Sequence, residues 1–225
     1  MKRRAVIMVL LVFCLALPFT GREETPLPAA PPEVNYDYGF GNMNQQTMNY
    51  LFEQGSLLIV RQKPDMTLIN ITGGQVVNAP LAKVWEVIND FEHYPEFMPQ
   101  TTEEKVLDRP SENRVLVEQS IGIKIWQLPS VDITYKLMQE LEPKSKVRFW
   151  HLDGSLPGTY GGWDLVPAGG QTMIFYTLYS NLTALGWGLG GIFKSQPDFM
   201  AGVNATTVIM VTKAVKKEAE RRAGK

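Results

Sequence analysis

Cysteine and histidine are almost missing from this chain of 225 residues. It holds one cysteine, Cys14, and two histidines, His93 and His151. A disulfide within the chain needs two cysteines, so none is expected. Zinc sites take their ligands mainly from cysteine and histidine, and these three residues do not supply such a set. We therefore predict no metal site.

The chain also lacks an excess of charge of either sign. Its 22 Lys and Arg residues face 23 Asp and Glu residues, which leaves a formal net charge of -1. Binding to nucleic acid depends on a positive field that attracts phosphates, so no nucleic-acid partner is predicted. Hydrophobic residues make up 44% and charged residues 20%, a balance typical of a folded domain.

Long apolar runs are missing as well, apart from one of 15 residues at positions 5–19. This run follows Met1-Lys2-Arg3-Arg4 and is shorter than the roughly 20 residues that a membrane-spanning helix needs. It is typical of a secretory signal peptide, with a retained N-terminal anchor as the alternative. We therefore expect an exported protein, either periplasmic or membrane-anchored facing the periplasm.

Composition divides the chain into three parts. Residues 1–21 are the signal peptide or anchor, and residues 22–55 form a proline-rich linker with a short helix at 44–54. Residues 56–225 are expected to fold as one domain.

Apolar spacing predicts a strand followed by two short helical elements. A strand at residues 69–77 meets Asn78-Ala79-Pro80, and a second short element covers residues 93–99. The stripe that predicts the first helix consists of Val84, Trp85, Ile88 and Phe91.

After residue 100 the apolar period changes from about 3.6 to about 2, which indicates antiparallel strands covered on one face. The predicted strands cover residues 57–61, 66–77, 115–126, 131–138, 147–152 and 172–182. Turns are predicted at residues 109–113, 128–130, 142–145 and 167–170.

A last helix is predicted from Ser195, as its cap, to about Arg222. Several β-branched residues at 206–212 favour a strand by propensity alone. A regular helical spacing outweighs that propensity and is carried by Phe199, Val203, Thr206 and Met210.

These motifs resemble the opening of a START-like domain, a superfamily also called SRPBCC or polyketide cyclase-like. The resemblance is carried by Asn78-Ala79-Pro80, Val84-Trp85, Asp90-Phe91 and Tyr94-Pro95-Glu96-Phe97-Met98-Pro99. The last of these is most similar to the coenzyme Q-binding branch. The resemblance implies an α+β helix-grip fold over about residues 69–222. In that fold a curved antiparallel sheet of about seven strands wraps around a long C-terminal helix, with two short helices after the first strand.

The same resemblance implies that the protein binds or carries a hydrophobic small molecule, such as a lipid, a quinone or a polyketide-like compound. The ligand would lie in a cavity between the sheet and the last helix, without a cofactor. Gln119, Tyr135 and His151 either orient the ligand there or reach water near strand ends. The expected ligand-binding residues are Gln119, Ile121, Ile123, Tyr135, Phe149, His151, Phe199, Val203, Thr206 and Met210.

Two other functions stay open. One is a cyclase-, aromatase- or hydrolase-type enzyme of the same fold, with Tyr135, His151 or Asp90 as acid and base. The other is a protein-interaction module. We assign no catalytic residue, because no recognisable catalytic set occurs and apolar inward faces favour binding over catalysis.

The glycine-rich segment 186–191 matches the spacing of a dinucleotide-binding loop. That loop requires a parallel βαβ unit, whereas this sheet is predicted to be antiparallel, so no nucleotide is expected. The uncharged segment 183–193 is interpreted in two ways, as a buried connection or as a gate that contacts a membrane. The membrane contact would use Leu185, Trp187, Leu189 and Phe193.

Overall fold

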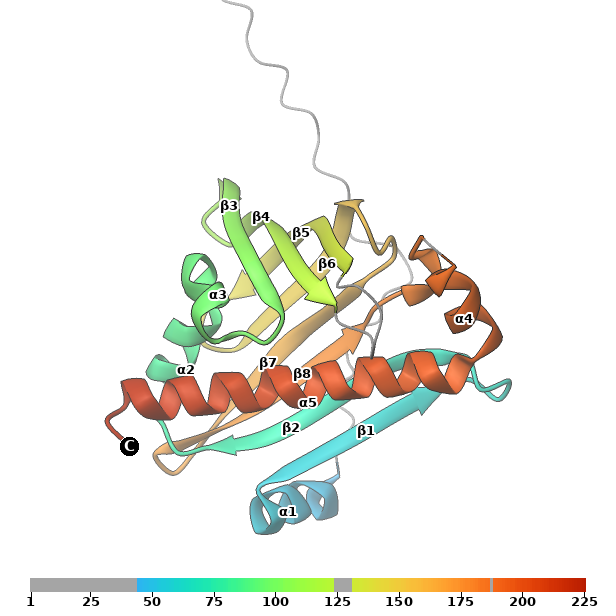
Figure 1. Cartoon of the computed structure of the whole chain (residues 1–225). Coiled ribbons are helices and arrows are strands. Elements are labelled where there is room, and N and C mark those ends of the chain that lie inside the picture. Colours follow the sequence, from blue (N-terminus) through green and yellow to red (C-terminus); the bar gives the residue numbers. More distant parts are fainter. Residues whose placement is uncertain (1–43, 124–130, 187) are drawn as a thin grey trace, which may run out of the picture.

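The computed structural model describes residues 44–123, 131–186 and 188–225. Within them one antiparallel sheet has eight strands in the order β1-β2-β8-β7-β6-β5-β4-β3. The long helix α5 (Pro197–Arg222) runs across this sheet (Figure 1). The predicted α+β helix-grip fold is confirmed, with eight strands in place of about seven. The strands are β1 (Ser56–Gln62), β2 (Leu68–Val77), β3 (Thr101–Ser111), β4 (Arg114–Ile123), β5 (Val131–Glu142), β6 (Lys146–Gly154), β7 (Tyr160–Ala168) and β8 (Gln171–Tyr179).

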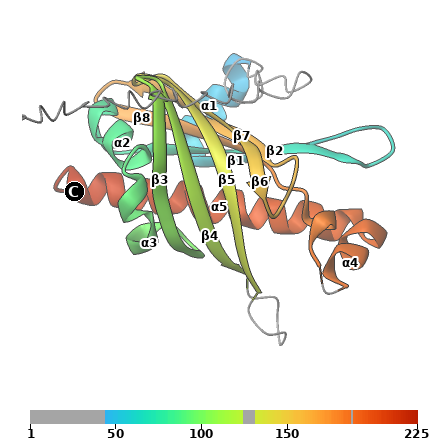
Figure 2. The same ribbon diagram turned by 90° about the horizontal axis from the view of Figure 1, so that it is seen from above.

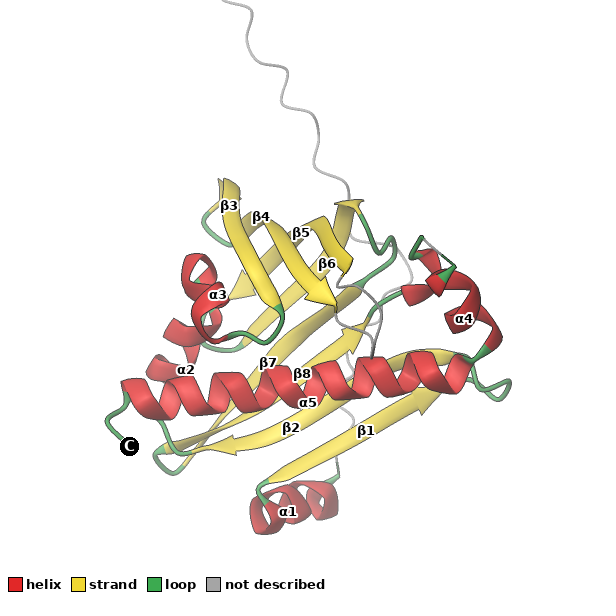
Figure 3. Cartoon of the chain, in the orientation of Figure 1, coloured by secondary structure: helices red, strands yellow, loops and turns green. Residues whose placement is uncertain are grey.

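The two short helices predicted after residue 80 are present. The helical segments are α1 (Gln45–Gln54), α2 (Leu81–Ile88), the 3₁₀ turn Phe91–His93, α3 (Tyr94–Phe97), the 3₁₀ turn Leu182–Ala184, α4 (Leu189–Ser195) and α5 (Pro197–Arg222). Helix α4 lies at the start of α5, α2 and α3 lie near its C-terminal end, and α1 lies beside β1 and β2, as Figure 2 and the colouring of Figure 3 show.

Some predictions fall outside the described residues. They are the signal peptide, the linker as far as residue 43, residues 124–126 of the strand predicted at 115–126, the turn at 128–130 and Trp187. The helix predicted at 44–54 is α1, whose first turn is capped by Asn44. The Asn44 side chain accepts a hydrogen bond from the Thr47 N–H at 2.9 Å.

Strands β3 and β7 were not singled out by alternation. In β3 the turn predicted at 109–113 is wrong at its start, because Arg109 and Pro110 belong to the strand. Ser111 pairs with Arg114, so only Glu112 and Asn113 form the connection to β4. Glycines and a proline weaken the apolar pattern of β7, and charged residues weaken that of β3.

Ser195 does not cap the last helix. It is the final residue of α4, and its hydroxyl donates to the Ile192 carbonyl at 3.0 Å. Gln196 precedes α5 without a side-chain cap, and Pro197 occupies the first helical position, where its missing N–H costs no hydrogen bond. The predicted end of α5 at Arg222 is confirmed.

The buried face of α5 lies beside the predicted stripe rather than on it. Phe199 is 44% exposed, whereas Asn204 and Val208 are buried. The threonines among the β-branched residues fit the helix because their hydroxyls are satisfied within it. Thr207 and Thr212 donate to carbonyls four residues earlier, at 3.0 and 2.9 Å. The buried stripe consists of Met200, Asn204, Val208, Thr212, Val215 and Ala219.

Helix α5 lies closest to the sheet at β2. A Cβ atom on Gly73 would lie 2.6 Å from Val208 Cγ1, closer than two carbon atoms pack. At its far end α5 is tied to the segment after α2, since Arg222 forms an ion pair with Asp90 at 2.7 Å. Glu218, on α5 itself, contacts the same guanidinium at 2.7 Å. The helix is therefore held against one half of the sheet.

Gly73→Ala is expected to destabilise the fold, because the new methyl group must displace the stiff Val208 side chain or the helix backbone. Overpacking of this kind costs about 1–3 kcal/mol. Urea denaturation should show a lower midpoint. Gly191→Ala in α4 is the matched control, since a Cβ there meets no atom within 4 Å. A Gly73→Ala midpoint equal to that of the control would contradict close packing at this point.

Candidate functional site

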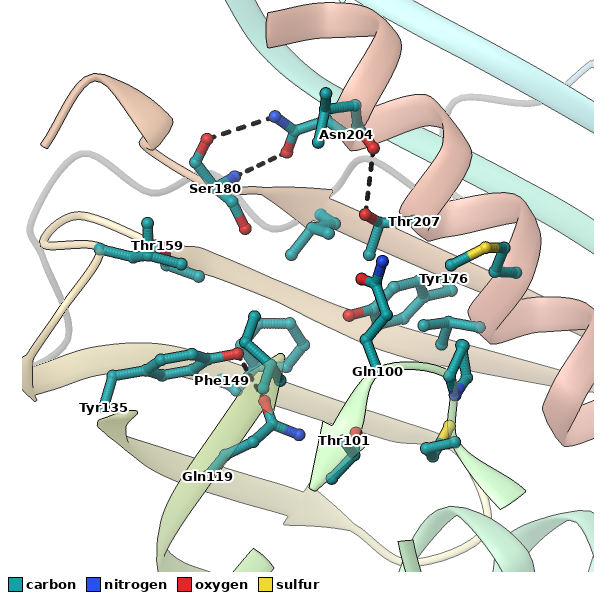
Figure 4. A pocket seen from close by; sticks show the side chains of 18 of the residues that line it. Gln100, Thr101, Gln119, Tyr135, Phe149, Thr159, Tyr176, Ser180, Asn204 and Thr207 are labelled. Carbon is teal, nitrogen blue, oxygen red and sulfur yellow. Dashed lines mark hydrogen bonds between the residues drawn. The ribbon is translucent and has the colours of Figure 1, made fainter. Parts of the chain in front are cut away.

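A cavity of about 570 Å³ lies between the sheet and α5. Figure 4 shows side chains from the strands and from α5 turned toward one space. Its floor is aromatic, with the Tyr176 ring 4.4 Å from the Trp163 ring and 6.1 Å from the Phe149 ring, centroid to centroid. Apolar walls with a few polar groups are typical of a small-molecule site.

Most of the residues predicted for this cavity line it. Strands β4, β5 and β6 contribute one group, and the flank of α5 beside its buried stripe contributes the other. The eight predicted residues in the lining are Gln119, Ile121, Tyr135, Phe149, Phe199, Val203, Thr206 and Met210.

His151 is not part of the lining. The β5–β6 register shifts at Lys136 and Leu137, which leaves Leu152 without a partner on β5. At this irregularity the His151 ring turns to the Gly154 carbonyl, with Nε2 at 3.3 Å from its oxygen. Ile123 ends β4, and its side chain lies outside what the structure describes.

Asp90 is an ion-pair residue and not part of the lining. Its carboxylate contacts Arg222 at 2.7 Å and His93 Nδ1 at 2.6 Å. Burial acts to raise the Asp90 pKa, but the hydrogen bonds from His93 and Arg222 outweigh it, so the pKa is lowered. Of the three acid–base candidates, only Tyr135 faces the cavity.

A row of polar side chains crosses the cavity wall on β3, β4 and β5. Glu104 pairs with Gln119, and Gln119 pairs with Tyr135, each directly across adjacent strands. The Tyr135 hydroxyl donates to Gln119 Oε1 at 2.5 Å, and Gln119 Nε2 donates to Glu104 Oε2 at 2.7 Å. The three side chains form one continuous hydrogen-bonded chain.

Glu104 is the buried acid of this row, with 5% of its surface exposed. Burial raises the pKa of its carboxyl to about 8, and the hydrogen bond from Gln119 only partly offsets this. Its Oε1 atom is buried and has no hydrogen-bond partner among the described residues. The Glu104 carboxyl is therefore neutral at neutral pH, and its Oε1 atom can still form a hydrogen bond.

Polar groups also lie at the end of the cavity near the start of α5. Asn204 bonds to the end of β8, accepting from Ser180 N at 2.8 Å and donating to Ser180 O at 3.2 Å (Figure 4). Thr159, in the β6–β7 connection, is 3% exposed, and its hydroxyl has no partner within the described part of the chain. Gln100 reaches the cavity from a left-handed backbone position, φ 64°.

Sequence reasoning missed Glu104, Gln100, Thr159 and Asn204. Glu104 stands among exposed charges on β3, and no alternation in the sequence marks it as buried. Asn204 is polar, so it did not contribute to the apolar spacing from which the buried face of α5 was predicted. Thr159 and Gln100 belong to connections, where periodicity carries no information about direction.

The segment before α5 is mostly packed into the protein. Leu189 is 7% exposed and Phe193 is 2% exposed, so neither is placed for the predicted membrane contact. Leu185 is partly buried against the core. Among the residues that the structure describes, no helix has the length and apolar character to span a membrane.

A curved sheet closed by one long helix over an apolar cavity defines a START-like protein. A family model described as polyketide cyclase / dehydrase and lipid transport matches residues 77–201, more than half of the chain. The chain belongs to this family. A search of curated proteins finds no match.

Solved structures show the same fold at low sequence identity. An aromatase/cyclase, Zhui, from Streptomyces sp. R1128 is 19% identical, with a TM-score of 0.52 over 68% of this chain and 94% of that one. A STAR-related lipid transfer protein from Xanthomonas axonopodis is 16% identical, with a TM-score of 0.55 over 74% and 94%. Human StAR-related lipid transfer protein 5 is 11% identical, with a TM-score of 0.54 over 75% and 83%.

Glu104→Gln is expected to change how stability depends on pH. The folded-state pKa of about 8 lies above the ordinary 4.5, so the folded state binds the extra proton. The contribution of Glu104 to the free energy of unfolding is full below pH about 4.5. It is lost as pH rises to about 8, and the loss is on the order of a few kcal/mol. Urea titrations from acid to alkaline pH should show Glu104→Gln gaining stability relative to the native protein. The exposed neighbour Glu103→Gln is the control, and equal curves for both variants would rule out a buried acid.

Proposed function

We propose that this protein binds and carries a hydrophobic small molecule, such as a lipid or a quinone, in the cavity beneath α5. The observation that carries the proposal is the cavity of about 570 Å³, whose aromatic and aliphatic walls also carry polar side chains that can orient a ligand. About ten buried methylenes would contribute about 8 kcal/mol. That gain is comparable with an association cost of about 4–15 kcal/mol, so little polar chemistry is needed.

Export is part of the proposal. The apolar run at residues 5–19, after Lys2-Arg3-Arg4, supports delivery to the periplasm or anchoring on its side of the membrane. A carrier that shields an apolar molecule from water suits a compartment between two membranes. Cell fractionation of the full chain tests the location, and recovery from the cytoplasm alone would exclude it.

One observation favours a second function, proton transfer on a bound polyketide-like molecule. Glu104 has a pKa near neutrality and lies at the cavity, as a general acid or base requires. Tyr135 does not serve as a base, because burial holds its pKa well above the ordinary value. Binding without turnover of polyketide-like compounds supports the carrier, whereas turnover lost in Glu104→Gln with binding retained supports the enzyme.

Val203→Trp is expected to fill the cavity and reduce binding at least about tenfold. Val203 lines the cavity from α5, whereas Ile209 on the same helix is 37% exposed and does not line it. Ile209→Trp is therefore the matched control. The measurements are native mass spectrometry with organic extraction and titration with the neutral fluorescent probe N-phenyl-1-naphthylamine. Equal binding by the two variants, or an empty native protein without affinity for the probe, would contradict the proposal.

A further inference from the structure

The polar row of Glu104, Gln119 and Tyr135 has a direction. An amide nitrogen only donates, so Gln119 Nε2 must face an acceptor, which here is Glu104 Oε2 at 2.7 Å. Gln119 Oε1 then faces Tyr135 and accepts its proton at 2.5 Å. In this arrangement the Tyr135 hydroxyl proton is used in the hydrogen bond to Gln119. Toward the cavity the Tyr135 oxygen therefore offers only lone pairs and can only accept a hydrogen bond.

The opposite direction is equally available when Glu104 carries a proton on Oε2. The carboxylic acid then donates to Gln119 Oε1, once the amide has turned over. Gln119 Nε2 donates to the Tyr135 oxygen, and the Tyr135 hydroxyl proton is free to point into the cavity. No covalent bond changes except for which Glu104 oxygen carries the proton. An ionised Glu104 forbids this reversed chain, because it has no proton to donate.

We propose that Glu104, Gln119 and Tyr135 form a reversible hydrogen-bond relay that lets the cavity receive either a hydroxyl or a carbonyl group of an apolar ligand at Tyr135. The proposal rests on the binding function above and names the ligand class, an apolar molecule with an alcohol or ketone oxygen. Glu104 is the positioning residue, and Tyr135 is the residue that contacts the ligand. Figure 4 shows the Tyr135 hydroxyl beside Gln119, facing the inner space.

Three features of the structure support a relay at this place. The three side chains are direct cross-strand partners, so the backbone register holds them in one row. All three line the cavity. Glu104 Oε1 is buried without a partner among the described residues, which favours the neutral acid that both directions of the chain can use.

Glu104 is the group in this row that ionises near neutral pH. The titratable groups that face it are Tyr94, Tyr135 and Tyr176, from α3, β5 and β8. Burial, with a smaller effect from Glu104 itself, raises the pKa of each tyrosine above its ordinary value of 10.0. All three stay neutral while the Glu104 carboxyl ionises around pH 8.

The test compares undecan-2-one with undecan-2-ol, two ligands of nearly equal shape. Each displaces N-phenyl-1-naphthylamine from the native protein at about pH 6 and about pH 9.5, below and above the Glu104 pKa. At the lower pH both should bind. At the higher pH the ketone should lose about tenfold in affinity relative to the alcohol, since Tyr135 then offers lone pairs only.

Variants separate the relay from a general structural effect. Glu104→Gln stays neutral and can donate or accept, so both ligands should bind at both pH values. Tyr135→Phe removes the contacting hydroxyl and should abolish discrimination between the two ligands at either pH. Glu103→Gln changes an exposed glutamate on the same strand and should keep the pH effect of the native protein.

The relay is overturned if the ketone-to-alcohol ratio in the native protein does not change with pH, or if Glu104→Gln retains the change. Displacement by neither ligand, with the fluorescent probe still bound, also overturns the relay and leaves the binding function standing. Failure of the native protein to bind the fluorescent probe at all would instead reject the binding function, and the relay with it.

Discussion

The close contact between α5 and β2 at Gly73 governs the rest of the structure. Only a residue without a side chain lets the Val208 methyl group come so near the strand, and the ion pairs of Arg222 hold the other end of the helix. A rigid helix of 26 residues pressed against one half of a curved sheet leaves the other half uncovered. The cavity is the space beneath α5 on that open side.

This arrangement gives α5 two faces with different roles. The stripe through Val208 and Val215 provides the packing that stabilises the fold. The flank through Val203, Thr206 and Met210 is rotated around the helix axis by half a turn or less from this stripe, and it lines the cavity. Since the second face does not carry the fold's main contacts, ligand preference can change there at a smaller cost in stability.

Periodicity predicted most of the strands and helices, because it reports which face of an element is buried, and the resemblance to START-like domains implied how they assemble into the helix-grip fold. Periodicity predicted the lining well where one face of a strand is apolar, as at Ile121 and Phe149. It failed where the pattern carries no such signal. His151 continues the alternation of β6, but an irregular pairing turns it away. Glu104 is a charged residue among charged residues, and only the β3–β4 register shows that it points inward.

Ligand preference in such a cavity must come from its polar atoms. Apolar walls distinguish ligands weakly, since each added methylene changes binding by only about 1–3 kcal/mol. A buried group that must find a hydrogen-bond partner discriminates more strongly, because an unmatched ligand leaves it unpaired. The family of this chain includes polyketide cyclases, dehydrases and lipid-transport proteins. One cavity can serve such different tasks if its walls supply affinity, while one ionisable side chain, here Glu104, decides which oxygen groups the cavity accepts.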